Sequence, residues 1–434
     1  MSNSGVLHGQ PGSRTSSSAR GSLDRRFAAA QPAAFGRVGR PTQRGMMMSR
    51  RRSPKSRRRG PDSIVKNAAS SFAAQMTTAS LTALLTVFLV RVLGAKQYGL
   101  FAVAIGFSTI AITFADLGIT NSTARFVAEH RGNDAQLHRL IADALKLKVV
   151  VTALACALLA ALSSVIAAAY GNSELVWPLR GIAIATFGQS TYLMLLGIST
   201  ALGRAAVNVR LVAAESLLEV SASIALVLAG AGATGAAFGR AFGYVLGALL
   251  AARVVPRLMG HRGQGKFWRL PQAAIVRQVG AYARSVFAID ASYTLSSSLS
   301  VLMVGIYSGS VASGVFQAPA KLITLIQYVG LATAQGVAPR LTRGPGQEPD
   351  VRALNWALRG LIGFQCVLLA PAVVWSGPIT RVLLGGGYAR SAAVLTALTP
   401  YIFFCGLGPL VTIGVNYLGE AQRRIPISVT TLVL

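Results

Sequence analysis

Among the charged side chains inside the long apolar runs of this 434-residue chain, eight are the best placed to do chemistry. A charge in the middle of a bilayer costs about 2.5–3.5 kcal/mol on insertion scales, so it usually faces a cavity or a partner. Guanidinium and ammonium groups suit the oxygens of a phosphate, whereas carboxylates suit a coupling proton or cation. The eight residues are Asp116, Arg180, Glu215, Glu219, Arg240, Arg284, Asp290 and Lys321.

Lys321 and Asp290 lie at similar depths in two neighbouring apolar runs, and two interpretations of them stay open. Lys321 is eight residues inside its run, which corresponds to about 12 Å of helix. Either the two side chains form an ion pair, or Lys321 contacts an anionic group while Asp290 carries a coupling proton or sodium ion. Arg240 and Arg284 are further candidates for anion contact, and Arg284 is close enough to the membrane surface to snorkel instead.

Three other carboxylates are candidates for ion coupling. Glu215 and Glu219 are four residues apart, which places both carboxyl groups on one face of a helix, where they can share a proton. Alternatively, this face is solvated or is paired with an arginine such as the nearby Arg210. Asp116 is near the end of its run, where it either caps a helix, pairs with Arg125 or takes part in ion coupling.

The composition indicates that these charges belong to a polytopic membrane protein. Hydrophobic residues make up 53% of the chain and charged residues only 13%, whereas a soluble domain carries about 25% charged residues. An ordinary soluble enzyme is therefore excluded. The formal net charge of +29 comes from 42 Lys and Arg against 13 Asp and Glu, and much of it lies in the first 66 residues and between the apolar runs.

Ten apolar runs are long enough to span a membrane, which takes about 20 residues of helix. Alternate linkers between them are rich in Lys and Arg, and by the positive-inside rule this pattern places the N-terminus in the cytoplasm. An eleventh run begins near Ile425. The predicted spans are 67–90, 99–121, 147–170, 177–202, 211–230, 232–252, 282–306, 313–339, 356–377 and 391–417.

A basic, Ser- and Gly-rich tail precedes the first span. It has no apolar segment of the kind found in a signal peptide, and its low hydrophobicity predicts disorder. The arginine-rich run at 49–59 resembles a nucleic-acid patch in isolation. Because it directly precedes a span, we interpret it as a contact with anionic membrane lipid, and we expect no nucleic-acid partner.

The chain aligns with itself at an offset of 215 residues. The segment 94–101 and the segment 309–316 both read G-x4-G-[LV]-F, and Arg125 falls on Arg340. These two arginines either anchor the topology or capture a headgroup. An even number of spans separates the copies, which predicts a parallel repeat of two six-helix halves.

The repeat predicts the domain organisation of the chain. Its parts are a disordered basic cytoplasmic tail (1–63), a six-helix N-terminal lobe (64–255), a basic cytoplasmic linker (256–278) and a second lobe (279–434). We expect the second lobe to be incomplete, after about ten and a half spans, and the chain to be poorly stable for that reason.

The sequence contains no complete enzyme motif, but one glycine motif predicts close packing between helices. The segment 260–266 resembles a phosphate-binding loop, but Phe267 stands where magnesium binding needs Ser or Thr. The four histidines show no metal-ligand spacing, and we expect neither a metal site nor a cofactor. Gly239, Gly243 and Gly247 form a stripe of small residues that allows two helices to approach closely.

Several motifs resemble those of the polysaccharide-biosynthesis, or Wzx-type, oligosaccharide flippases, which share a superfamily (MOP) with the MATE exporters and the lipid II flippases. The likeness covers about 64–434. It is carried by Arg91-Val92-Leu93-Gly94 through Tyr98-Gly99-Leu100-Phe101, by Ala115-Asp116-Leu117-Gly118-Ile119, by Ala124-Arg125-Phe126-Val127-Ala128-Glu129 and by Gly314-Val315-Phe316-Gln317-Ala318-Pro319-Ala320-Lys321.

The resemblance implies two six-helix lobes around a cavity that opens alternately to each side of a bacterial inner membrane. It implies an undecaprenyl-pyrophosphate-linked oligosaccharide as substrate. Its pyrophosphate is the anionic group that Lys321 contacts in the second of the two interpretations given above. The implied partners are membrane lipids and the polymerase or ligase machinery of O-antigen, capsule or exopolysaccharide assembly. A MATE-like cation or drug antiporter is the alternative, although it would favour an acidic cavity. A membrane glycosyltransferase would need larger outer loops than this chain has.

Overall fold

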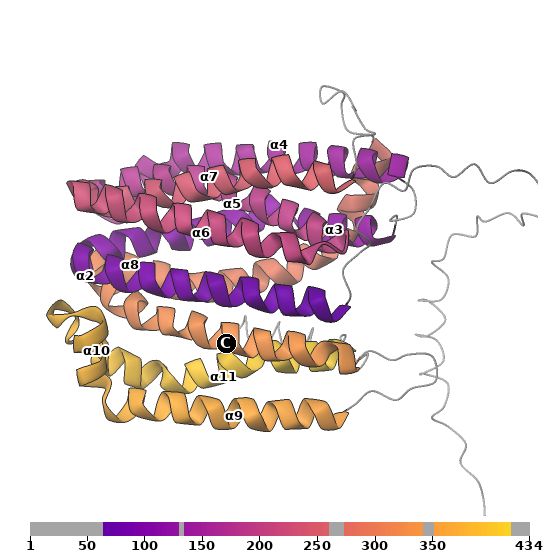
Figure 1. The fold of residues 1–434 in the computed structure, drawn as a ribbon. Coiled ribbons are helices and arrows are strands. Elements are labelled where there is room, and N and C mark those ends of the chain that lie inside the picture. Colours follow the sequence, from indigo (N-terminus) through magenta and orange to yellow (C-terminus); the bar gives the residue numbers. More distant parts are fainter. Residues whose placement is uncertain (1–63, 130–133, 260–272, 342–350, 418–434) are drawn as a thin grey trace, which may run out of the picture. The chain divides into compact units, whose positions relative to one another are not determined.

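The computed structural model describes residues 64–129, 134–259, 273–341 and 351–417, and all regular structure in these ranges is helical (Figure 1). The main helices are α2 (Ile64–Asp116), α3 (Ile119–Glu129), α4 (Asp134–Ala169), α5 (Val176–Ala201), α6 (Ala205–Leu226), α7 (Gly232–Met259), α8 (Ala273–Leu341), α9 (Val351–Val374), α10 (Ser376–Leu384) and α11 (Ser391–Tyr417). A π-helical turn at Val227–Ala231 joins α6 to α7, and short 3-10 turns at Ser173–Leu175 and Gly386–Tyr388 precede α5 and α11.

Seven helical stretches in the described residues are long and apolar enough to cross a membrane. The longest of them, 45 and 52 residues, are interrupted, at Gly94 in α2 and at Gly230 and Gly232 between α6 and α7. Each therefore holds two of the predicted spans. The expected membrane protein of long helices is confirmed.

Two predicted linkers are much shorter than we expected from the sequence. The chain passes from one predicted span to the next inside α2 at Gly94 and inside α8 at Gly309, whose φ angles are 67° and 80°. Positive φ is easily reached only without a Cβ, so one glycine replaces a loop at each place. Both α2 and α8 fold back on themselves, at the left of Figure 1.

The two breaks obey the predicted offset of 215 residues, and so do the contacts beside them. A Cβ on Gly99 would lie 1.7 Å from the carbonyl oxygen of Ser310, and a Cβ on Gly314 would lie 2.1 Å from that of Ala95. Ala95 and Ser310 are themselves equivalent in the repeat. This exchange of equivalent contacts has the form of an interface across a two-fold axis, and it holds α2 against α8.

The family-like segment after Gly94 also ties together other turns at the same end of the helices. Lys96 forms an ion pair with Glu174 at 2.7 Å. The Gln97 amide donates a hydrogen bond to Glu174, and its oxygen accepts one from the Ala233 backbone N–H. Arg91 donates to the backbone carbonyls at the end of α10. The segment therefore has a structural role: it holds the turns at this end of the helices together.

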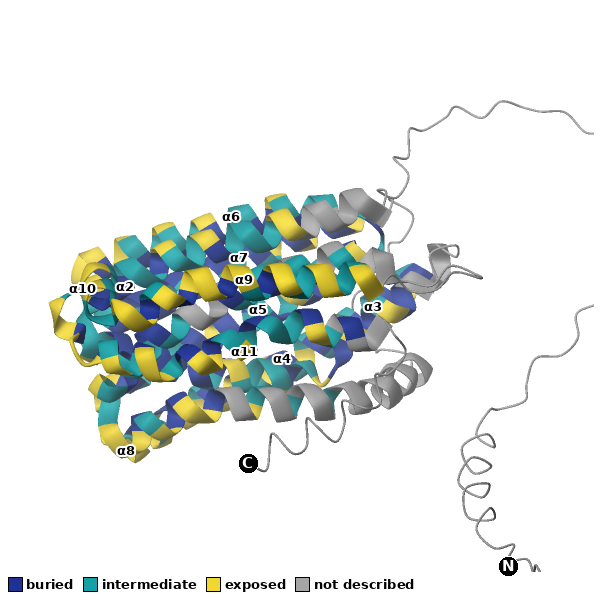
Figure 2. Cartoon of the chain, turned by 90° about the horizontal axis from the view of Figure 1, so that it is seen from below, coloured by how far each residue is buried: buried dark blue, intermediate teal, exposed yellow. Residues whose placement is uncertain are grey.

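Large apolar residues remain exposed along the outward helix faces, which are yellow in Figure 2. On α4, Leu154, Leu158 and Val165 lie on one face and are all more than half exposed. A larger buried core joins α2, α4, α5 and α7 and extends to α8, and a smaller one joins α8, α9 and α11. The exposed apolar surface suits contact with lipid.

The reciprocal glycine contact predicts a selective effect of small substitutions. Gly99→Ala or Gly314→Ala forces a methyl group into a backbone carbonyl, so we expect each to lower the free energy of unfolding by about 1–3 kcal/mol. Gly360→Ala is the matched control, because a Cβ there meets nothing within 4 Å. Thermal unfolding of the purified chain in detergent measures the difference. Equal midpoints for Gly99→Ala and Gly360→Ala would contradict the contact.

Candidate functional site

A buried ion pair joins α6 to α7. The guanidinium of Arg240 donates to Glu219 Oε1 at 2.5 Å, and both side chains are largely buried. The guanidinium lies over the ring of Tyr244 at 4.8 Å from its centroid, and it is 3.4 Å from the Gln189 side-chain oxygen. Its Nε is buried without a hydrogen-bond partner among the described residues. Arg240 is therefore fixed in place but keeps one unused donor.

The predicted glycine stripe positions this pair. A Cβ on Gly243 would lie 2.6 Å from the Glu219 Cβ, and one on Gly247 would lie 2.7 Å from the Glu215 Cγ. The third glycine, Gly239, meets the backbone of Ser223 in the same way. The close packing that the stripe predicts is thus confirmed, and the face of α6 that it covers carries both glutamates.

Glu215 and Glu219 are 4% and 8% exposed, which rules out the solvated face that the sequence left open. The partner of Glu219 is Arg240 on α7, rather than the nearby Arg210. Charge spacing along one helix did not reveal this, because the partner comes from the next helix. Glu215 accepts a hydrogen bond from Ser216 at 3.2 Å, but its Oε1 is buried without a partner within the described part of the chain.

Lys321 on α8 lies beside this pair. Its side chain is half-buried and makes no hydrogen bond or ion pair with any residue that the structure describes. Arg240 and Glu219 are close enough to act on it electrostatically, and Arg240 and Glu219 act likewise on Tyr328 of α8. Side chains from α5, α6, α7 and α8 thus form one cluster, which we call the Arg240 cluster: Gln189, Glu215, Glu219, Arg240, Tyr244, Lys321 and Tyr328.

The charges of the Arg240 cluster lie well inside the helices. Lys321 follows the break at Gly309 by twelve residues and Arg240 follows Gly232 by eight, which correspond to about 18 Å and about 12 Å of helix. Both counts start from the same end of the molecule, because Gln97 bonds to Ala233 while Gly99 meets Ser310. Both charges therefore lie two or more helical turns in from that end of the helices.

The other predicted site residues lie outside this cluster or outside the described side chains. Arg284, Asp290 and Arg340 fall within α8, but their side chains are outside the part that the structure describes. The predicted alternative of a Lys321–Asp290 pair therefore stays a prediction. Arg125 is exposed on α3. Arg180, at the start of α5, lies over the Trp177 ring at 5.1 Å and reaches Ser163.

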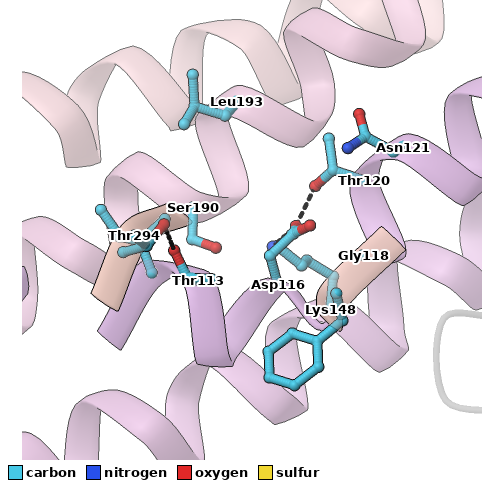
Figure 3. A pocket seen from close by; sticks show the side chains of 11 residues that line it. Thr113, Asp116, Gly118, Thr120, Asn121, Lys148, Ser190, Leu193 and Thr294 are labelled. Atoms are coloured by element: carbon cyan, nitrogen blue, oxygen red, sulfur yellow. Dashed lines mark hydrogen bonds and ion pairs between the residues drawn. The ribbon is translucent and has the colours of Figure 1, made fainter. Parts of the chain in front are cut away.

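A second buried ion pair joins α2 to α4. Asp116 ends α2, and the positive φ angles of Leu117 and Gly118 turn the chain into α3. The Asp116 carboxylate accepts hydrogen bonds from the ammonium of Lys148 and from the hydroxyl of Thr120 (Figure 3). Lys148 stands at the very start of the predicted span 147–170 and was not among the candidate site residues. In the structure it is only 1% exposed, so it is a site residue that the sequence analysis missed.

This pair lines a cavity of about 250 Å³, which we call the Asp116 pocket. Its wall comes from α2, α3, α4, α5 and α8 and includes hydroxyl, amide and aromatic groups. Thr113 of α2 donates to Thr294 of α8 at 3.0 Å across it (Figure 3). The lining residues are Ile112, Thr113, Asp116, Gly118, Thr120, Asn121, Lys148, Ser190, Leu193, Phe287 and Thr294.

Comparisons with known proteins agree with this architecture. The sequence profile of the family described as polysaccharide biosynthesis protein matches residues 64–344, well over half of the chain. The chain belongs to this family. The fold of the described residues is one that solved membrane transporters share. No curated protein matches the chain.

Solved transporters of the MOP superfamily share the fold at low sequence identity. An inward-facing multidrug resistance MATE transporter is 14% identical over 82% of this chain and 84% of that chain, with a TM-score of 0.63. The Vibrio cholerae MATE transporter VcmN in its bent form is 16% identical over 84% and 85%, with a TM-score of 0.57. A MOP superfamily transporter from Pyrococcus furiosus is 15% identical over 84% of each chain, also with a TM-score of 0.57.

The Glu219–Arg240 pair predicts strong coupling between its two partners. Glu219→Gln or Arg240→Gln leaves the other charge buried and unpaired, so we expect each to lower the free energy of unfolding by about 3–5 kcal/mol. The double variant removes both charges and should cost less than the sum of the two. Thermal unfolding in detergent measures the cycle.

The matched control is the exposed pair Lys96–Glu174, whose side chains are about half exposed. The same cycle there should show a much smaller coupling, because solvent screens an exposed pair. Strictly additive effects of the Glu219 and Arg240 substitutions would mean that the buried pair does not form.

Proposed function

We propose that the chain translocates an undecaprenyl-pyrophosphate-linked oligosaccharide across the inner membrane of a bacterium by alternating access. The polysaccharide biosynthesis family supports a role in glycan assembly, and the MOP fold supports transport. The substrate class follows from the family-like motifs and from the charges of the Arg240 cluster. In this proposal 64–255 and 279–434 form the two lobes, and the N-terminus is cytoplasmic.

The observation that carries the proposal is positive charge inside the apolar helices without a partner among the described residues. Lys321 lacks a hydrogen bond or ion pair among the described residues, and the Nε of Arg240 is a buried donor without an acceptor there. Leaving such groups unpaired in an apolar region is costly, so they normally face a ligand or a cavity. A pyrophosphate supplies several oxygens that accept from guanidinium and ammonium groups together.

The polarity of the cluster favours an anionic substrate over a cationic drug. Glu219 is already neutralised by Arg240, which leaves Lys321 facing the pair. A carrier of cationic drugs would favour a cavity with net acidic charge, whereas in this cluster the two basic residues, Arg240 and Lys321, equal the two glutamates in number. The Pyrococcus furiosus MOP transporter is described as having a binding pocket of reverse polarity that suggests a different function, and we apply the same reasoning to this chain.

Several predicted residues keep a role in this proposal. Arg284, Arg125 and Arg340 are further candidates for contact with the headgroup, at the ends or along the path of the helices. Glu215, whose buried Oε1 lacks a partner in the described part, is the strongest candidate for carrying a coupling ion together with Glu219. Asp290 is a second candidate. Membrane lipids and the polymerase or ligase machinery are the proposed partners.

A binding measurement tests the role of Lys321. The full chain in lipid nanodiscs should bind undecaprenyl pyrophosphate more tightly than undecaprenol. Lys321→Gln removes one charge-assisted hydrogen bond, worth about 1.5–3 kcal/mol, and should weaken binding of the pyrophosphate by about tenfold or more. Lys96→Gln is the matched control, because Lys96 pairs with Glu174 at one end of the helices. It should leave the affinity within about twofold.

Two results would overturn the proposal. Equal affinity for undecaprenyl pyrophosphate and undecaprenol would remove the headgroup contact. Tight binding of the lipophilic cation tetraphenylphosphonium that Glu219→Gln abolishes, with no binding of the pyrophosphate, would favour the drug antiporter.

A further inference from the structure

The Asp116 pocket lies apart from the Arg240 cluster and is not explained by it. Asp116 follows Gly94 by twenty-two residues along α2, which corresponds to about 33 Å of helix. Lys321 lies about 18 Å along α8 from the equivalent break at Gly309. The pocket is therefore nearer the end of the helices that the charge pattern places in the cytoplasm.

The Asp116–Lys148 pair argues against an ion as the occupant of this pocket. A cation would bind at the carboxylate, but the ammonium of Lys148 already occupies that position. An anion would approach Lys148, but Asp116 shields it, and Lys148 is almost fully buried. The pair leaves a pocket wall that is strongly polar and has no net charge.

The rest of the lining suits a polyhydroxyl ligand. The hydroxyls of Thr113, Ser190 and Thr294 and the amide of Asn121 offer both donors and acceptors around the cavity. The ring of Phe287, which packs edge to face on Phe114, adds an apolar surface to the same wall. A wall of polar groups with one aromatic side chain matches the hydroxyls and the C–H groups of a sugar ring.

The size of the pocket limits the ligand. A volume of about 250 Å³ is below the range of about 300–1,000 Å³ typical of sites for drug-sized molecules. It fits one sugar unit rather than a whole oligosaccharide. From the sequence, Asp116 was a candidate for ion coupling. Because it is paired with Lys148, we assign it to the polar wall of the pocket instead.

We propose that the Asp116 pocket binds one uncharged sugar unit of the transported glycan, through Asp116, Asn121 and the surrounding hydroxyls. This inference rests on the proposed function and extends it to recognition of the glycan. A sugar would meet the pocket near the cytoplasmic end while the pyrophosphate moves towards Lys321.

Saturation-transfer NMR tests the pocket with free sugars. The probes are methyl glucoside and the methyl glycoside of N-acetylglucosamine, added to the full chain in nanodiscs. Leu193→Trp places a larger side chain in the wall of the pocket and Asn121→Ala removes the amide, so each should weaken glycoside binding by about tenfold or more. Ile184→Trp is the matched control: it lies on the same helix and is 48% exposed, against 43% for Leu193, but it does not line the pocket.

The outcomes separate this inference from the proposed function. Lys321→Gln should keep glycoside binding while it loses pyrophosphate binding. Binding of undecaprenyl pyrophosphate without any glycoside signal would overturn the sugar site alone. Glycoside signals that are equal in the wild type and in Leu193→Trp would place the sugar elsewhere. Sodium binding that Asp116→Asn abolishes, without any glycoside signal, would make the pocket an ion site.

Discussion

The cost of removing charge from water is the constraint on which the interior of this protein depends. Glu219–Arg240 and Asp116–Lys148 are both buried pairs that join neighbouring or nearby helices. Either charge alone would be strongly destabilising, so each pair ties the position of one helix to that of another. The functional groups are thereby held on rigid elements rather than on loops.

Glycines make these pairs geometrically possible. The stripe on α7 lets its backbone approach the α6 face that carries Glu215 and Glu219, and Arg240 on α7 then reaches Glu219. At the reciprocal contact, Gly99 and Gly314 let α2 approach α8 to carbonyl distance. A membrane interior supplies little hydrophobic force between helices, so close backbone packing of this kind takes its place.

Hydropathy and spacing predicted much of the fold, because a span and a packing stripe are local properties of the chain. They did not predict that Gly94 and Gly309 would replace whole linkers, since that depends on the backbone angle of one residue. The pairing of Glu219 with Arg240, and the burial of Lys148 at the edge of a predicted span, are properties of helix packing. The positions of charges along the chain do not say which side chains meet when helices pack against one another.

Lys321 differs from the paired charges, because it has no hydrogen bond or ion pair among the described residues. If Lys321 served stability alone, an apolar residue in its place would be more stabilising. Even a well-formed buried ion pair is often no more stabilising than apolar residues of similar size. Arg240 is neutralised by Glu219 and still presents an unused donor, while Lys321 has no protein partner in the described part. Within the described residues these two donors have no acceptor. In the proposed function, a mobile anionic headgroup accepts hydrogen bonds from both during transport and is then released.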